Sequence, residues 1–162
     1  DGEMFTDDLD AAEQSVVAAA GGTYAHPTNQ GWRGATRTTW KAWHNAKTPT
    51  ATPALQAAYV AARTAAAKIV AATIRRHLLQ PGGAQPSGHL LVHCGGGMHR
   101  TGMVVGVLDR CINGTAMARI EVDYKRHVGW QSAAQPGGFE AQNLDFIQHF
   151  PCEMLRPKGQ QK

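Results

Sequence analysis

The segment from residue 89 to residue 111 constrains the fold of this chain more than any other feature. Residues 89–93 are mostly apolar and predict a short buried strand that ends at Cys94. Three consecutive glycines follow, and glycine adopts backbone conformations that other residues avoid. A helical pattern then begins near Arg100. The order strand, glycine turn and helix predicts a loop whose N–H groups converge at a helix start, which is an anion-binding geometry.

Helical periodicity accounts for much of the remaining sequence. The expected helices cover about 6–20, 53–79, 100–111, 115–128 and 138–149. Gly21-Gly22 closes the first of these helices, Thr52 caps the second with Pro53 at its first position, and Asn113-Gly114 ends the third. The predicted buried stripe of the second helix consists of Leu55, Tyr59, Ala62, Ala66, Ile69, Val70, Ile74 and Leu78.

Charge is distributed unevenly along the chain, whose net charge is +4. Six of the twelve acidic residues lie in the first thirteen positions, where they complement the dipole of the first expected helix. Between Gln14 and Leu108 there is no Asp or Glu, while nine Lys or Arg residues occur. This stretch predicts a positive potential that suits an anionic substrate. The alternative is a basic surface that only keeps the protein soluble.

The three cysteines are Cys94, Cys111 and Cys152, and they form neither a CxxC pair nor a metal-ligand spacing. An odd number favours free thiols over a disulfide framework, and without a metal-ligand spacing we expect no zinc site. No cofactor is expected either. The apolar runs are broken by basic residues, and no membrane span is expected. A reducing, cytoplasmic compartment is expected for a reactive thiol. No leader is visible, but the first residue is Asp1, so a removed leader and an exported enzyme stay open.

The glycine loop predicts a phosphate site with a cysteine nucleophile. A helix start and nearby cations lower the pKa of a thiol from about 8.5, so Cys94 is expected to attack phosphorus as a thiolate. Arg100, six residues later, can bind two phosphate oxygens at once, and Thr101 can hydrogen-bond the departing sulfur. His93 is expected to orient the loop. The predicted phosphate cradle consists of Gly95, Gly96, Gly97, Met98, His99 and Arg100.

Residues 93–102 resemble the His-Cys-x5-Arg-Ser/Thr-Gly signature of the protein tyrosine and dual-specificity phosphatase superfamily, in which Gly102 also matches. Residues 136–146 are similar to the Pro-Asn-x-Gly-Phe-x-x-Gln-Leu helix start of dual-specificity members. The resemblance implies an α/β fold, with a parallel sheet flanked by helices. It also implies a hydrolase that needs no metal and cleaves phosphomonoesters through a phosphocysteine intermediate.

Two features depart from the family pattern. Members usually carry an acidic general acid thirty to forty residues before the cysteine, and such acids contribute roughly 10²–10⁴-fold to the rate. Here the candidates are His44, the N-terminal residues Asp7, Asp8 and Asp10, or a substrate whose leaving group needs no acid. The chain also offers only one convincing strand. Either the fold is helix-rich with a sheet that is reduced or disguised by composition, or an N-terminal part is missing.

We expect one phosphatase-like domain over 1–162. Its parts are an N-terminal helix and basic, Trp-rich loop region at 1–53, a catalytic core at 54–150 and a polar tail at 151–162. The expected substrate is a phosphotyrosine or phosphoserine/threonine protein. Alternatives are an inositol phosphate phosphatase, an RNA 5′-triphosphatase acting on nucleic acid, and a phosphate-binding pseudophosphatase. An exposed Cys94 thiolate is also expected to oxidise, with Cys111 and Cys152 as candidate resolving partners.

Overall fold

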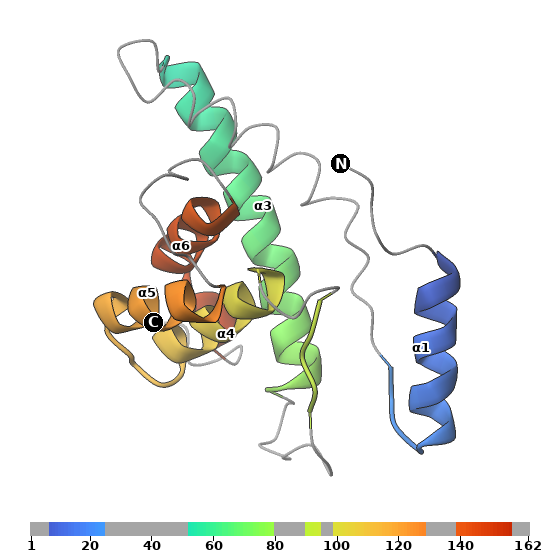
Figure 1. The fold of residues 1–162 in the computed structure, drawn as a ribbon. Coiled ribbons are helices and arrows are strands. Elements are labelled where there is room, and N and C mark those ends of the chain that lie inside the picture. The colour runs from blue at the N-terminus through green and yellow to red at the C-terminus, as the bar shows by residue number, and fades with distance from the viewer. Residues whose placement is uncertain (1–6, 25–51, 80–89, 95–98, 129–138, 157–162) are drawn as a thin grey trace.

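The computed structural model describes residues 7–24, 52–79, 90–94, 99–128 and 139–156 of the chain. Its elements are α1 (Asp7–Ala19), α3 (Pro53–His77), α4 (His99–Cys111), α5 (Met117–His127), α6 (Phe139–His149) and the 3-10 helix η2 (Cys152–Leu155). Figure 1 shows α4, α5 and α6 gathered on one side of α3, with α1 standing apart from them. The described core is therefore helix packed on helix.

The predicted parallel sheet is wrong for the part of the chain that the structure describes, where no residue lies in a strand. Residues 90–93 of the predicted strand have no regular structure, and Leu91 is 82% exposed. The run of three apolar residues, Leu90 to Val92, matches a strand pattern, but it does not supply the neighbouring strand that must pair with it. In the described part of the chain, the apolar core is formed by side chains packed between helices instead.

The start of α3 confirms the cap predicted for it. The backbone N–H of Leu55 donates to Thr52 Oγ1 at 3.3 Å, and Pro53 occupies the first helical position, where its missing N–H leaves no donor unpaired. The last turn is basic, which complements the negative end of the helix dipole. The buried residues of α3 are Tyr59, Ala66, Ala67, Val70, Ala71 and Ile74. Four residues of the predicted stripe are thus buried, whereas Leu55, Ala62, Ile69 and Leu78 are only partly buried, and Ala67 and Ala71 are buried in addition.

By length and composition, α3 is the one helix among the described residues that is apolar enough to cross a membrane. Helices in the core of soluble proteins pass the same test, so the finding is weak evidence for a span. Its buried face belongs to the same apolar core as α4, α5, α6 and η2.

Two glycines let α4 lie close to its neighbours. A Cβ atom on Gly106 would lie 2.5 Å from Ile147 Cδ1 on α6, and one on Gly102 would lie 2.8 Å from Tyr124 Cε2 on α5. Because the two glycines are four residues apart, they lie on one face of the helix. The buried side chain of Asn143 donates to the Tyr124 hydroxyl at 2.8 Å, so this polar pair is satisfied inside the core.

A polar cluster joins α3 to α6. The Asp145 carboxylate accepts hydrogen bonds from the Tyr59 hydroxyl and from Arg63 Nη1, the latter at 3.0 Å. His149 Nδ1 lies 3.3 Å from Asp145 Oδ1. Burial and the hydrogen bond to Asp145 raise the pKa of Tyr59 far above its usual value, so the phenol stays protonated.

Helix ends follow the predicted glycines. Gly21 and Gly114 adopt the left-handed backbone conformation, with φ of +74° and +69°, just beyond α1 and α4.

The cysteine prediction fails in one respect, because Cys111 and Cys152 form a disulfide. An odd number of cysteines leaves open which two can meet, and only the packing of η2 against α4 brings this pair together. In η2, within the segment predicted as a polar tail, Leu155 is buried.

Candidate functional site

The candidate site lies at the N-terminal end of α4. This helix begins at His99, five residues after Cys94, and Arg100 follows in its first turn. No acidic residue lies in that turn, so the positive end of the helix dipole and the guanidinium charge occur together without a neighbouring carboxylate in the same turn. Such a helix end favours an anion. The remaining cradle residues, Gly95 to Met98, lie outside the described residues.

Thr101 and Gly102 follow Arg100 in α4, and both lie against the protein interior. Thr101 Oγ1 is buried and has no hydrogen-bond partner among the described residues. A buried hydroxyl left unpaired costs about 1–3 kcal/mol, so such a group calls for an explanation. Gly102 lies directly against the Tyr124 ring, where any side chain would collide with it. The structure therefore gives Gly102 a packing role.

Cys94 is half-buried and takes no part in the disulfide. The two cysteines predicted as its resolving partners are bonded to each other instead. In this structure, neither Cys111 nor Cys152 is a thiol that can condense with an oxidised Cys94. That prediction was wrong, because the candidates were chosen by cysteine count rather than by position in the fold.

His93, the predicted loop-orienting residue, is held by a side chain from α1. Its Nε2 atom lies 2.6 Å from Glu13 Oε1 on α1. The other carboxylate oxygen, Oε2, accepts a hydrogen bond from the Tyr24 hydroxyl at 3.1 Å. The carboxylate of Glu13 thus joins His93 and Tyr24, one through each oxygen.

Sequence reasoning missed the role of Glu13. It appeared only as one of six N-terminal acids, whose helix-dipole role gave each of them the same explanation. The partner, His93, lies eighty residues further along the chain, and no sequence periodicity links two such positions.

The predicted general acids remain predictions. Asp7 and Asp8 are the first two residues of α1, at the positive end of the helix dipole. His44 lies outside the described residues. Within the described ranges, no group of three or more His, Cys, Asp or Glu side chains is placed to hold a metal ion.

Comparison with family models, with curated proteins and with solved structures finds no match for this chain. The resemblance to phosphatases is therefore carried by residues 93–102 and 136–146 alone.

Proposed function

We propose that this chain is a cysteine-dependent phosphatase that hydrolyses phosphomonoesters through a phosphocysteine intermediate. The observation that carries the proposal is the run from Cys94 to Gly102 at the start of α4. Arg100 lies in an acid-free first turn, and the buried Thr101 hydroxyl lacks a partner among the described residues. A phosphate-binding loop gives a purpose to both, because it needs a cation and a hydroxyl close to the sulfur.

In the proposed first step, the Cys94 thiolate attacks phosphorus and forms a sulfur–phosphorus bond. The bond from phosphorus to the leaving oxygen breaks, and that oxygen takes up a proton. In the second step, water attacks phosphorus, loses a proton and releases the thiolate. Arg100 binds two phosphate oxygens throughout, and the Thr101 hydroxyl donates a hydrogen bond to the sulfur as it leaves.

The proposed substrate is a phosphotyrosine or phosphoserine/threonine protein. The acid-free stretch from Gln14 to Leu108 supports an anionic substrate. It also keeps open the inositol phosphates and the triphosphate ends of RNA, whose anhydride needs little protonation of the leaving group. We do not assign the proton donor to Glu13, because its two oxygens already lie against His93 and Tyr24.

The first test compares p-nitrophenyl phosphate with phenyl phosphate, whose leaving group is poorer, on wild type and Cys94→Ser. We expect wild type to release phosphate from both and Cys94→Ser to lose more than about 10⁴-fold. The matched control is Glu121→Gln, which removes the charge of a carboxylate paired with Lys125 on α5. Equal activity of wild type and Cys94→Ser would refute the proposal.

Two further variants separate the steps. Arg100→Lys keeps the charge but loses the two-pronged geometry, and we expect a loss of about 10²–10³-fold. Thr101→Val keeps the shape without the hydroxyl, so phosphocysteine should accumulate and be detected by mass spectrometry after acid quenching. Loss in His44→Ala, Asp7→Asn or Asp8→Asn confined to phenyl phosphate would identify the general acid.

One outcome supports the pseudophosphatase instead. If wild type binds phosphate or vanadate, and this binding requires Arg100, but no substrate is turned over and no phosphocysteine forms, then the loop is a recognition site.

A further inference from the structure

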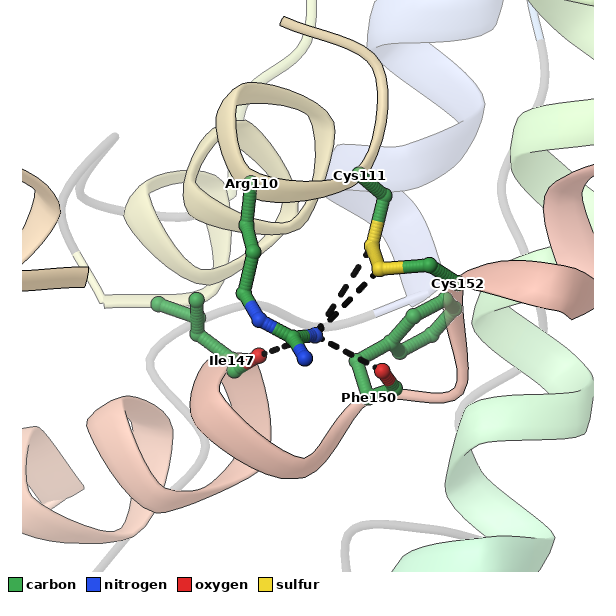
Figure 2. The surroundings of a disulfide bond; sticks show 5 residues. All are labelled: Arg110, Cys111, Ile147, Phe150 and Cys152. Carbon is green, nitrogen blue, oxygen red and sulfur yellow. Dashed lines mark hydrogen bonds between the residues drawn. A yellow bond between two sulfur atoms is a disulfide. The ribbon is translucent and has the colours of Figure 1, made fainter. Parts of the chain in front are cut away.

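The disulfide between Cys111 and Cys152 lies beside a guanidinium group. Arg110 Nη1 is 3.3 Å from Cys152 Sγ and 3.9 Å from Cys111 Sγ. The same nitrogen donates to the carbonyl oxygens of Phe150, at 2.7 Å, and Ile147, at 3.1 Å (Figure 2). These carbonyl groups belong to the end of α6 and the residue after it, so they hold the cation in place whether or not the sulfur atoms are bonded.

The two sulfur atoms are therefore not equivalent toward negative charge. A nearby cation stabilises a thiolate, and the guanidinium lies closer to Cys152. Cys111 is the last residue of α4, where the negative end of the helix dipole disfavours a thiolate. Both effects favour a thiolate on Cys152 over one on Cys111. When the disulfide breaks, the negative charge is therefore more stable on Cys152.

Access and charge both suit an attacking thiolate. Cys111 and Cys152 are each partly exposed rather than buried. The guanidinium attracts an anionic nucleophile as well as the anionic leaving group. A thiol–disulfide exchange proceeds faster when the leaving sulfur is the better-stabilised thiolate.

We propose that Cys111–Cys152 is a directional thiol–disulfide exchange site for small thiols such as glutathione or for a protein dithiol. The attacking thiolate forms a bond to Cys111 Sγ. The original sulfur–sulfur bond breaks, and its electron pair leaves with Cys152 Sγ, which Arg110 holds as a thiolate. A second thiolate then attacks the added sulfur and frees Cys111, which takes a proton from water. The protein disulfide is reduced, and two thiols are oxidised to a disulfide. This exchange does not depend on the proposed phosphatase activity.

The test uses the full chain carrying Cys94→Ser, so that only the paired cysteines react. The oxidised protein is mixed briefly with glutathione and quenched with excess N-ethylmaleimide near neutral pH, which alkylates the released thiolate before it re-attacks. Mass spectrometry of the peptides then locates both groups. We expect glutathione on Cys111 and maleimide on Cys152, in at least about fivefold excess over the reverse. Equal amounts of the two products, or the reverse preference, would overturn the proposal.

The role of Arg110 is tested with Arg110→Gln, which removes the charge, and Arg110→Lys, which keeps it. The preference should weaken in the Gln variant, in which only the helix-dipole effect remains, and persist in the Lys variant. Arg156→Gln, at an exposed position four residues after Cys152, is the matched control and should behave as wild type. An unchanged preference in a folded Arg110→Gln protein would contradict the assignment. If that variant fails to fold, the site of modification in the parent and in Arg110→Lys still decides.

Discussion

The two ends of α4 are held in different ways. At the C-terminal end, Cys111 is bonded to Cys152, and Arg110 donates to two carbonyl oxygens from the end of α6. At the N-terminal end, the buried Thr101 hydroxyl has no partner among the described residues, and the first turn carries a cation without an acid.

This difference separates stability from function along one helix. The polar groups at the C-terminal end are satisfied by the protein itself, so that end anchors the bundle. The N-terminal end carries the Arg100 guanidinium and the Thr101 hydroxyl, which the proposed function assigns to binding an anion. Changes at the anchored end should therefore alter the free energy of unfolding, and changes at the other end should alter phosphate chemistry.

The largest effect on stability is expected from removing the disulfide. The double variant Cys111→Ser/Cys152→Ser opens a loop whose ends are 41 residues apart, and the loss should be about 2–4 kcal/mol in the free energy of unfolding. Urea unfolding measures it. Phosphate release per folded molecule should stay as in wild type, because the site is at the other end of α4. A stability loss below about 0.5 kcal/mol would show that the C-terminal end of α4 does not anchor the bundle.

The next effect concerns the middle of α4, where Gly106 lies against Ile147 and Ile120. Gly106→Val places new atoms where a Cβ alone would lie 2.5 Å from a fully buried isoleucine, and overpacking should cost about 1–3 kcal/mol. The control is Ala118→Val on the exposed face of α5, which should change stability by no more than about 0.5 kcal/mol. Equal unfolding curves for both variants would show that α4 and α6 do not approach closely.

A pH experiment tests the satisfied polar groups between α3 and α6. Because the pKa of Tyr59 is raised by folding, the unfolded chain loses this proton first as pH rises, so the folded state binds more protons. Its contribution to stability is complete below about pH 10 and declines above it, by up to about 1.4 kcal/mol per pH unit. Urea unfolding of wild type and Tyr59→Phe between pH 8 and 11 should give curves that converge above pH 10. Parallel curves would contradict this.

The smallest effect on stability is expected from Glu13→Gln on α1, whose partner His93 precedes the N-terminal end of α4. The pair with His93 is exposed, with side-chain exposures of 35% and 41%, and such pairs contribute no more than about 1 kcal/mol. We expect the alkylation rate of Cys94 by iodoacetamide to change by up to about fivefold, the equivalent of that energy. Glu121→Gln, which alters an exposed pair within α5, is the control and should leave Cys94 unaffected. Identical rates in the two variants would remove Glu13 from the site.

Local signals in the sequence predicted the helices well. Thr52 and Pro53 marked the start of α3, and Gly21 and Gly114 marked the ends of α1 and α4, because each acts on its own turn of backbone. The start of α4 just after the glycine run was also predictable, and with it the place of Arg100.

Contacts between distant segments were not predictable in the same way. The strand expectation failed because pairing needs a second strand, which a run of three apolar residues between two histidines does not specify. The Cys111–Cys152 bond and the Asp145 cluster join residues more than forty positions apart, so they depend on how the helices pack. Of the candidate site, residue types and helix register were readable, whereas the contact of Glu13 with His93 was not.

The disulfide also makes a covalent ring of the chain between residues 111 and 152, and this ring contains all of α5 and α6. A protease that cuts once inside the ring therefore produces two pieces that remain linked through sulfur. Under non-reducing conditions such a nicked molecule keeps its full mass, and only a thiol reductant separates the fragments. Cleavage within the ring therefore leaves the fragments joined as long as the bond between Cys111 and Cys152 survives.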